Sequence, residues 1–137
     1  MMLDFVEPGG FMFKFDIKQG YHHIDIRAAQ QFFLGFSWLI EGILRYFMYT
    51  VLTFGISSAP FNFNKTMRPL VKYWRMNSIK VACFIDDGGA CDQSIDRARS
   101  KSKFVQATLS ASGFVVNEQK SIWEPTKSLP KAYQGYI

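Results

Sequence analysis

The chain is poor in the residues that stabilise disulfide-rich and zinc-binding folds. Its 137 residues include two cysteines, Cys83 and Cys91, and two histidines. The two cysteines lack the paired spacing of a metal-binding motif, which argues against a zinc site, and they are too few for a disulfide framework. We therefore expect both to be structural residues, with Cys83 in the core.

Long apolar runs are also lacking. No run approaches the roughly 18 residues that a membrane-spanning helix needs, and no secretory signal peptide opens the chain. Internal repeats, low-complexity tracts and a domain boundary are absent as well. These absences predict one domain over residues 1–137 of an intracellular protein, cytoplasmic or nuclear and not secreted, with no membrane partner.

Aromatic residues, in contrast, are abundant. They make up 17% of the chain and include 14 phenylalanines, while 48% of all residues are hydrophobic and 20% are charged. Such a chain is globular, with either a phenylalanine-rich core or an aromatic surface that awaits a partner. The net charge of +5 suits a polyanionic partner, although solvated lysines also account for it.

Two adjacent carboxylates follow the clearest strand signal of the chain. Residues 79–85 form a short apolar run, typical of a buried strand, and lead into Asp86 and Asp87. Asp87 and Gly88 predict the two-residue turn of a hairpin, since such turns need positive φ. The carboxylates would lie at the hairpin tip, either as metal ligands or as an ordinary acidic turn.

Three further strands are predicted from alternation and β-rich composition. Residues 11–16 alternate between phenylalanines and other side chains, which is typical of a half-buried strand, and this strand ends at Asp16. Residues 32–39 and 44–52 are two β-rich runs on either side of Glu41-Gly42. They predict a second hairpin.

The first helix is predicted from Ser57 or Ser58, either of which can cap it, with Pro60 in its first turn. Its apolar stripe contains Phe63, Met67, Leu70, Val71 and Trp74. The opposite face is basic, and we interpret it as solvated, with contact to a phosphate backbone as the alternative. Its cations are Lys65, Arg68, Lys72 and Arg75.

The second helix is predicted to start after Ser94, a favourable N-cap residue, and to end at Gly113. We expect a short strand at 114–116, loops around 123–130 and a last edge strand at 133–137. The order of strands and helices, without the inserted hairpin, is β-α-β-β-α-β. This predicts an α+β fold: a split βαβ unit, with a ferredoxin-like antiparallel sheet and two helices.

That topology brings Asp16 close to Asp86 and Asp87. Three carboxylates form a hard, oxygen-only site that suits Mg²⁺ or Mn²⁺. Two such ions about 3.5–4 Å apart can activate a hydroxyl and stabilise a leaving pyrophosphate. Three unrelated surface aspartates remain the alternative on this reasoning alone.

Four segments resemble the motifs of reverse transcriptases, in that family's order. They are Phe-Lys-Phe-Asp-Ile-Lys-Gln-Gly-Tyr-His-His-Ile (13–24), Leu-Thr-Phe-Gly-Ile-Ser-Ser-Ala-Pro (52–60), Phe-Ile-Asp-Asp (84–87) and the segment 113–120. The resemblance covers roughly residues 11–137. Residues 33–38 and 68–75 look closest to DIRS-like retroelements, with gypsy-type elements as the next neighbour.

The resemblance implies the palm domain of a retrotransposon RNA-directed DNA polymerase, with a partial fingers β-hairpin at about 32–52. It implies an RNA or DNA template, a DNA primer and dNTPs as partners, together with the rest of a retroelement polyprotein. N-terminal fingers, thumb and RNase H, with a recombinase or integrase, are expected to be absent from this chain. The alternative is a catalytically inactive, truncated remnant with weak nucleic-acid binding. An RNA-recognition module is disfavoured because an Asp ends each key strand.

The resemblance also implies roles for individual residues. Asp16 and Asp86 would be the principal ligands of two Mg²⁺ ions, with Mn²⁺ as an alternative, and Asp87 would complete the catalytic triad. Tyr21 would exclude a 2′-hydroxyl, although core packing is an equally good interpretation. The nucleotide-binding residues would be Ile17, Gln19, Gly20, Tyr21, Phe54, Gly55 and Lys120.

Two departures from the family pattern affect these implications. Thr53 stands where these elements usually have proline, which changes the turn. The expected primer grip at Tyr133, Gln134, Gly135 and Tyr136 replaces a more usual Trp-Leu-Gly type of sequence.

Overall fold

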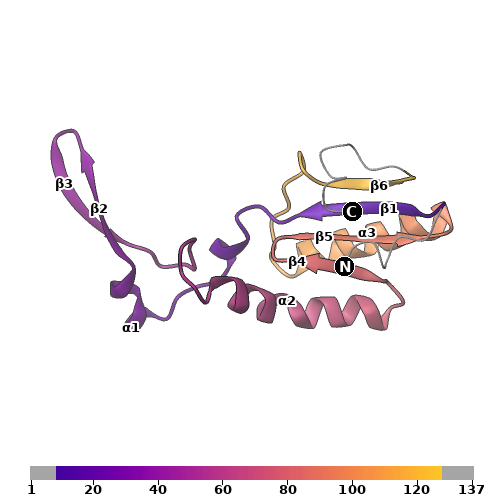
Figure 1. Cartoon of the computed structure of the whole chain (residues 1–137), viewed down its shortest axis with the longest axis horizontal. Coiled ribbons are helices and arrows are strands. Elements are labelled where there is room, and N and C mark those ends of the chain that lie inside the picture. Colours follow the sequence, from indigo (N-terminus) through magenta and orange to yellow (C-terminus); the bar gives the residue numbers. More distant parts are fainter. Residues whose placement is uncertain (1–8, 128–137) are drawn as a thin grey trace.

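The structure is a computed structural model that describes residues 9–127. Figure 1 shows two parts: a sheet covered by two long helices, and a hairpin that extends away from it. The elements, in chain order, are β1 (Phe11–Asp16), a 3₁₀ helix (Gly20–His23), α1 (Ala28–Gln31), a second 3₁₀ helix (Phe32–Leu34), β2 (Gly35–Ile40), β3 (Ile43–Met48), α2 (Ala59–Met76), β4 (Val81–Phe84), β5 (Asp87–Asp92), α3 (Ile95–Ala111) and β6 (Ile122–Thr126).

We call β1, β4, β5 and β6 with α2 and α3 the sheet unit. Its strands pair in the order β4-β5-β1-β6, and all three pairings are antiparallel. This is the strand order of a split βαβ unit. The predicted α+β fold with a ferredoxin-like sheet is therefore confirmed.

Aromatic rings fill the core between the sheet and the helices. Phe15 of β1 lies edge-on to Trp74 of α2, with ring centroids 5.6 Å apart, and stacks on Trp123 of β6 at 6.1 Å. Trp74 is fully buried, and its indole N–H donates a hydrogen bond of 2.7 Å to Thr108 Oγ1 of α3. The contacts of these rings join both helices to the sheet.

The turn of the acidic hairpin lies two residues earlier than predicted. Ile85 and Asp86 form the turn, with Ile85 at φ 54°, and Asp87 and Gly88 are already in β5. Gly88 has another purpose: a Cβ built on it would lie 2.2 Å from Phe15 Cζ. The predicted Asp87-Gly88 turn was wrong because Gly88 is needed for the space that the Phe15 ring occupies, and its φ is not positive.

The fourth strand of the sheet was also predicted in the wrong place. Residues 114–116 contribute only an isolated bridge, between Val116 and Ile17. The strand β6 instead covers 122–126, which was predicted to be loop. Pro125 is compatible with this strand because β6 lies at the edge of the sheet, where a missing N–H leaves no neighbour unpaired.

Strand β1 is more deeply buried than the predicted half-buried strand. Both of its faces are covered: Lys14 is 6% exposed and Asp16 is 9% exposed, alongside the buried phenylalanines. The pattern of alternation predicted a solvent-facing side because it does not report what packs onto the second face.

The start and end signals of the helices were confirmed in part. The Ser94 hydroxyl accepts a hydrogen bond from the Arg97 N–H at the start of α3, and Gly113 follows this helix at φ 86°. Ser58 precedes α2 but its side chain makes no capping hydrogen bond. The predicted serine cap of α2 was therefore wrong, whereas the positions of both helices were right.

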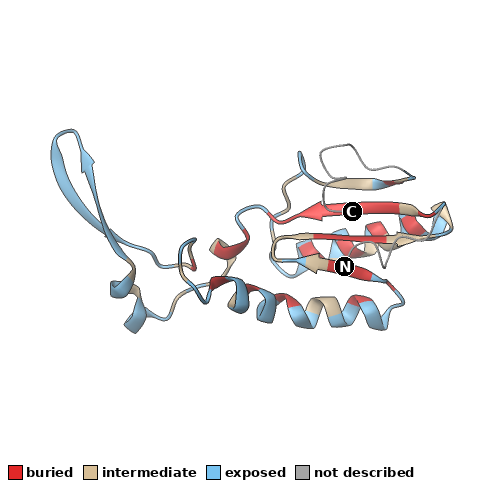
Figure 2. Ribbon diagram, viewed as in Figure 1, coloured by how far each residue is buried: buried red, intermediate tan, exposed pale blue. Residues whose placement is uncertain are grey.

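Strands β2 and β3 form the predicted second hairpin, but the predicted runs 32–39 and 44–52 were too long, since Phe32–Leu34 is a 3₁₀ helix and β3 ends at Met48. The turn residues Glu41 and Gly42 both have positive φ, 50° and 79°, the conformation that matches strand twist in two-residue turns. Every residue of the two strands is exposed (Figure 2). The abundant aromatics thus supply both a buried core in the sheet unit and an aromatic surface on the hairpin.

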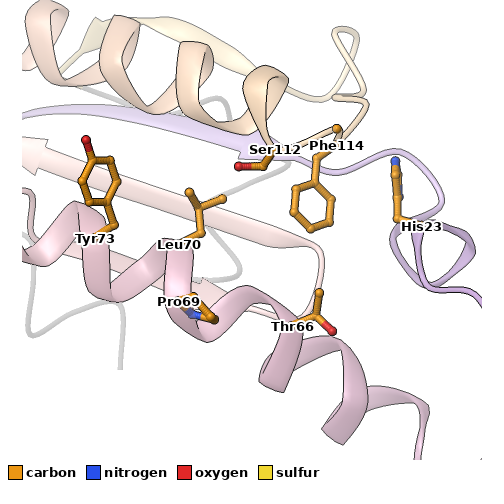
Figure 3. A pocket seen from close by; sticks show the side chains of 8 residues that line it. His23, Thr66, Pro69, Leu70, Tyr73, Ser112 and Phe114 are labelled. Atoms are coloured by element: carbon orange, nitrogen blue, oxygen red, sulfur yellow. The ribbon is translucent and has the colours of Figure 1, made fainter.

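His23 joins the first 3₁₀ helix to the segment that follows α3. Its Nε2 accepts a hydrogen bond from the Val115 N–H at 3.0 Å, so Nδ1 carries the proton and donates to the Gly20 carbonyl at 3.2 Å. His23 also borders a groove of about 460 Å³ between α2 and the end of α3 (Figure 3).

In the described residues, no helix combines the length and apolarity needed to span a bilayer.

Candidate active site

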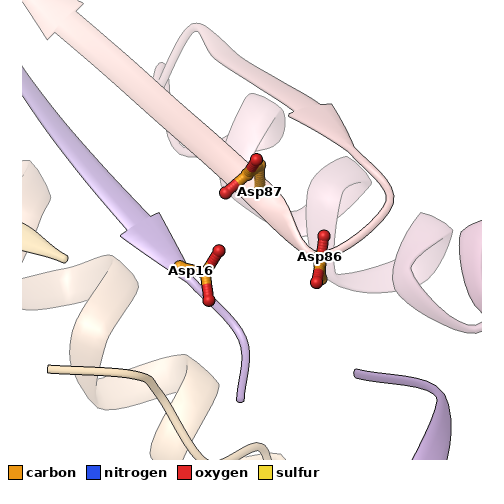
Figure 4. Close-up of side chains that lie close together, drawn as sticks. All are labelled: Asp16, Asp86 and Asp87. Atoms are coloured by element: carbon orange, nitrogen blue, oxygen red, sulfur yellow. The ribbon is translucent and has the colours of Figure 1, made fainter. Parts of the chain in front are cut away.

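Three aspartates converge where β1 ends and β4 turns into β5. Asp16 is the last residue of β1, Asp86 lies in the turn and Asp87 pairs directly with Asp16 across the sheet. One oxygen of each carboxylate lies within 4.8 Å of one oxygen of the other two. The side chains point toward a common space (Figure 4).

Backbone hydrogen bonds fix the relative position of these residues. The Ile17 N–H donates to the Asp86 carbonyl at 2.8 Å, which ties the end of β1 to the turn. The Asp16 N–H donates to Ser121 Oγ at 3.0 Å, and the Asn117 N–H donates to the Asp16 carbonyl at 2.8 Å. The carboxylates therefore project from a backbone that is held on both sides.

Burial and crowding raise the pKa of two of the carboxyl groups, Asp16 and Asp86. Burial, followed by the hydrogen bond and the negative charge of Asp87, raises the pKa of Asp16 to about 7. Burial also raises the pKa of Asp86. The ammonium of Lys120 acts against both shifts, and that of Lys14 against the shift of Asp86. Close carboxylates repel one another unless protons or cations neutralise them.

One oxygen of the site is buried without a hydrogen-bond partner in the described part of the chain. This atom is Asp87 Oδ1, and the ammonium of Lys14 lies 3.7 Å from it, which is an ion-pair distance but not a hydrogen bond. Buried polar atoms are almost always satisfied, so this oxygen is available to accept a ligand. An oxygen-only donor set with this unsatisfied atom fits a hard divalent cation.

The loop after β1 brings Gly20 against the acidic cluster. A Cβ built on Gly20 would lie 3.0 Å from Phe63 Cζ and 3.1 Å from Asp86 Cβ, so a larger residue here would require these neighbours to shift by a few tenths of an ångström. Gln19, before it, is exposed and left-handed, with φ 50°. Ile17 is buried in the core and reaches the site through its backbone.

The aromatic residues of the predicted nucleotide site form one cluster. Tyr21 is buried, with its ring 5.0 Å from that of Phe54 and 5.8 Å from that of Phe63. Phe54 is mostly exposed and precedes Gly55, which has φ 88°. Tyr21 is thus part of the core, while Phe54 presents its ring to the outside.

Two residues near the carboxylates were missed in the sequence. The Lys14 ammonium forms an ion pair with Asp87. The Ser121 hydroxyl accepts a hydrogen bond from the Asp16 N–H and donates one to the Asn117 carbonyl at 2.8 Å. The alternation of β1, which puts Lys14 and Asp16 on one face, was a signal for the lysine. No sequence signal marks Ser121. The predicted primer grip and last strand at 133–137 lie outside the described residues.

Comparison with known protein families adds the decisive observation. The family described as reverse transcriptase (RNA-dependent DNA polymerase) matches residues 9–130 of the chain. The chain belongs to the reverse transcriptase family. By family it is an RNA-directed DNA polymerase, a nucleotidyltransferase whose substrates are a primed nucleic-acid template and dNTPs.

The expected family is therefore confirmed, and the three aspartates of the acidic cluster lie within the residues that the family matches. Members of the family generally use Mg²⁺, and the three carboxylates described above could hold such an ion. The comparison with curated proteins found no significant match.

Proposed function

We propose that the chain carries the metal-dependent nucleotidyl-transfer centre of a reverse transcriptase, with Asp16, Asp86 and Asp87 as ligands of two Mg²⁺ ions. Mn²⁺ is the alternative ion. The observation that carries this proposal is the convergence of three carboxylates around an unsatisfied buried oxygen, Asp87 Oδ1. When bound, the ions would activate the primer hydroxyl and stabilise the leaving pyrophosphate.

The cations of the site have roles that follow from their positions. Lys14 balances the charge of Asp87, which limits repulsion between the carboxylates before a metal binds. Lys120 acts electrostatically on Asp16 and Asp86 and, in this proposal, neutralises the departing pyrophosphate. A single ammonium supplies a mobile point charge, which suits a leaving group that must move away.

Residues of the loop after β1 and of the segment before α2 would bind the nucleotide. Gln19 and Gly20 would offer backbone N–H groups to the triphosphate, with Ile17 anchoring their start in the core. Tyr21 is backed by Phe63 and Phe54, so its ring is fixed and can act as a steric filter against a ribose hydroxyl. Phe54 and Gly55 would border the nucleotide and the templating base.

The remaining proposals rest on sequence resemblance. Residues 33–38 and 68–75 look most like DIRS-like retroelements, with gypsy-type elements as the next neighbour, which supports a retroelement origin of this kind. The hairpin would be part of the fingers, and the enzyme would work beside fingers, thumb and RNase H of a polyprotein, with a recombinase or integrase. Its location would be intracellular, cytoplasmic or nuclear.

The test is primer extension on an RNA template by the wild-type chain and by Asp86→Asn, with Mg²⁺ and with Mn²⁺. We expect extension to be lost in Asp86→Asn while binding of the primer–template, followed by fluorescence anisotropy, is retained. The matched control is Asp96→Asn, at an exposed aspartate of α3, which should extend as the wild type does. Extension by Asp86→Asn at the wild-type rate would overturn the metal-ligand assignment.

The second candidate is a catalytically inactive remnant that binds nucleic acid weakly. The observation that favours it is the small number of cations at the site: in the described chain, Lys14 and Lys120 are the ones that act on the carboxylates. The same assay separates the two functions. Binding of primer–template without extension by the wild-type chain, with either ion, would favour the remnant.

A further inference from the structure

Helix α2 has an outer face whose positive charges lack counter-charges in residues 9–127. The helix contains no acidic residue over Ala59–Met76. Its cations are Lys65, Arg68, Lys72 and Arg75. None of them forms an ion pair with a described residue, whereas Arg97, Arg99 and Lys101 of α3 each lie 2.6–2.9 Å from a carboxylate oxygen.

This arrangement weakens the helix that carries it. Arg68 and Lys72 are four residues apart, so they are neighbours on the helix surface, and like charges at this spacing repel. The first turn of α2 also lacks the acidic residue that would favour its dipole. Helix α3, by comparison, has Asp96 in its first turn. Because no described carboxylate pairs with the cations of this face, they are available for an external anion.

A groove of about 590 Å³ runs beside these cations, between α2 and strand β4. Its charged lining consists of Arg68, Lys72 and Arg75, with no acidic residue among them. The rest of the lining is mainly apolar and adaptable, since methionine side chains adjust to irregular partners. These residues are Met67, Val71, Met76 and Cys83, with the polar Asn64.

Strand β4, on the other side of this groove, has only part of its edge open for pairing with another strand. β4 is at the edge of the sheet, where a free strand could pair with an added segment. Arg75 Nη2, however, donates to the Val81 carbonyl at 3.2 Å and occupies part of that edge. A partner would therefore enter the groove with its side chains instead of extending the sheet.

We propose that the groove between α2 and β4 binds an acidic peptide segment with apolar side chains, supplied by a partner protein. Carboxylates of the segment pair with Arg68 and Lys72, and its apolar side chains cover Val71, Met76 and Cys83. A nucleic acid fits less well, because no aromatic ring lines the groove to stack on a base, and phosphates leave the apolar lining uncovered. None of the three catalytic aspartates lines this groove.

The test measures binding to the full chain by fluorescence anisotropy, without divalent cations, so that its outcome does not depend on the metal site. The probe is a labelled peptide of about sixteen residues, built from glutamate and leucine. Two probes of similar length serve as comparisons: an all-glutamate peptide and an oligothymidylate. The variant is Arg68→Glu with Lys72→Glu, at two exposed positions. The matched control reverses two exposed cations elsewhere, Arg45→Glu with Lys103→Glu.

We expect the glutamate–leucine peptide to bind more tightly than both comparison probes. The Arg68/Lys72 variant should weaken this binding by about tenfold or more, and the Arg45/Lys103 control should not. Equal loss in the control would overturn the proposal, since it would show attraction by net charge alone. Tighter binding of the oligothymidylate, lost in the Arg68/Lys72 variant, would overturn it in favour of a nucleic-acid surface. Absence of peptide binding would overturn it outright.

Discussion

In the sheet unit, Phe13, Phe15 and Trp74 are at most 1% exposed, whereas Phe36 and Trp38 of the hairpin are 41% and 66% exposed. The same kinds of residue therefore serve two purposes in one chain. In the sheet unit they exclude water between strands and helices, which stabilises the fold. In the hairpin they are held by cross-strand pairs and a favourable turn, and a two-stranded hairpin gains little stability of its own in water.

This difference in burial indicates that the sheet unit, and not the hairpin, determines the stability of the chain. Aromatic pairs such as Phe36 and Phe47, whose rings are 5.5 Å apart, order the hairpin locally without contacting the core of the sheet unit. The exposed apolar side chains of the hairpin form a surface of the kind that contacts another molecule. Changes in the sheet unit should therefore affect folding, and changes in the hairpin should not.

The largest effect is expected at Gly88. In Gly88→Val, the added side chain would collide with the Phe15 ring, which lies 2.2 Å from where even a Cβ would be placed. Because this ring is packed between Trp74 and Trp123, it has no room to move. We expect a chain without a cooperative thermal transition by circular dichroism. A normal transition in Gly88→Val would show that the core is looser than described. Gly42→Val, at the hairpin turn, should leave the transition of the sheet unit in place.

A paired substitution sharpens the comparison directly. Phe13→Ala removes a buried ring and should lower the free energy of unfolding by about 3–5 kcal/mol. Phe36→Ala makes the same chemical change in the hairpin and should lower it by less than about 0.5 kcal/mol. Urea denaturation followed by circular dichroism measures both. Similar losses in the two variants would break the distinction between the regions.

An intermediate effect is expected at Asp92, which ends β5. Burial raises the pKa of Asp92, but hydrogen bonds from Lys101, the Ser94 N–H and Arg97 outweigh it and hold the pKa well below its usual range. This lowered pKa means that the ionised form stabilises the fold above the ordinary pKa of about 4. The stabilisation is lost as the pH falls through the lowered pKa.

We therefore expect Asp92→Asn to lower the free energy of unfolding by about 2 kcal/mol at neutral pH. The difference from the wild type should shrink steadily as the pH is lowered below about 4. Urea denaturation at a series of pH values provides the measurement, with Asp96→Asn as the exposed control. A difference that does not change with pH would contradict the role of these ion pairs.

The smallest effect is expected from removing the hairpin. Leu34 and Tyr49 are adjacent, since the Tyr49 N–H donates to the Leu34 carbonyl at 3.1 Å, so two glycines can replace residues 35–48. The free energy of unfolding of the sheet unit should change by less than about 0.5 kcal/mol. A larger loss, measured by urea denaturation, would show that the hairpin contributes to the core.

The same contrast explains what could be predicted from the sequence. Features set by neighbouring residues were predicted well: the bounds of β1, the Glu41-Gly42 turn and the Ser94 cap of α3. Features set by distant residues were not. The role of Gly88 depends on the Phe15 ring, and the strand at 122–126 forms because β1 has a free edge for it.

The candidate site falls between these cases. Its three aspartates could be predicted because the order of elements puts the end of β1 beside the β4–β5 turn. The hydrogen bond between Ser121 and the Asp16 N–H could not be predicted, because the sequence of a loop does not indicate which strand end the loop will contact. Gly20 was expected to approach a triphosphate, and in the structure its lack of a side chain makes room for Phe63 and Asp86.

Binding of Mn²⁺ to the wild-type chain and to Asp86→Asn, followed by electron paramagnetic resonance at pH 8, tests the three-carboxylate site most directly. At this pH the Asp16 carboxyl, whose pKa is raised to about 7, is mostly ionised and available as a ligand. We predict that the wild type binds Mn²⁺, that Asp96→Asn binds it equally and that Asp86→Asn binds it at least about tenfold more weakly. If Asp86→Asn binds Mn²⁺ with the wild-type affinity, the assignment of a three-carboxylate metal site is contradicted.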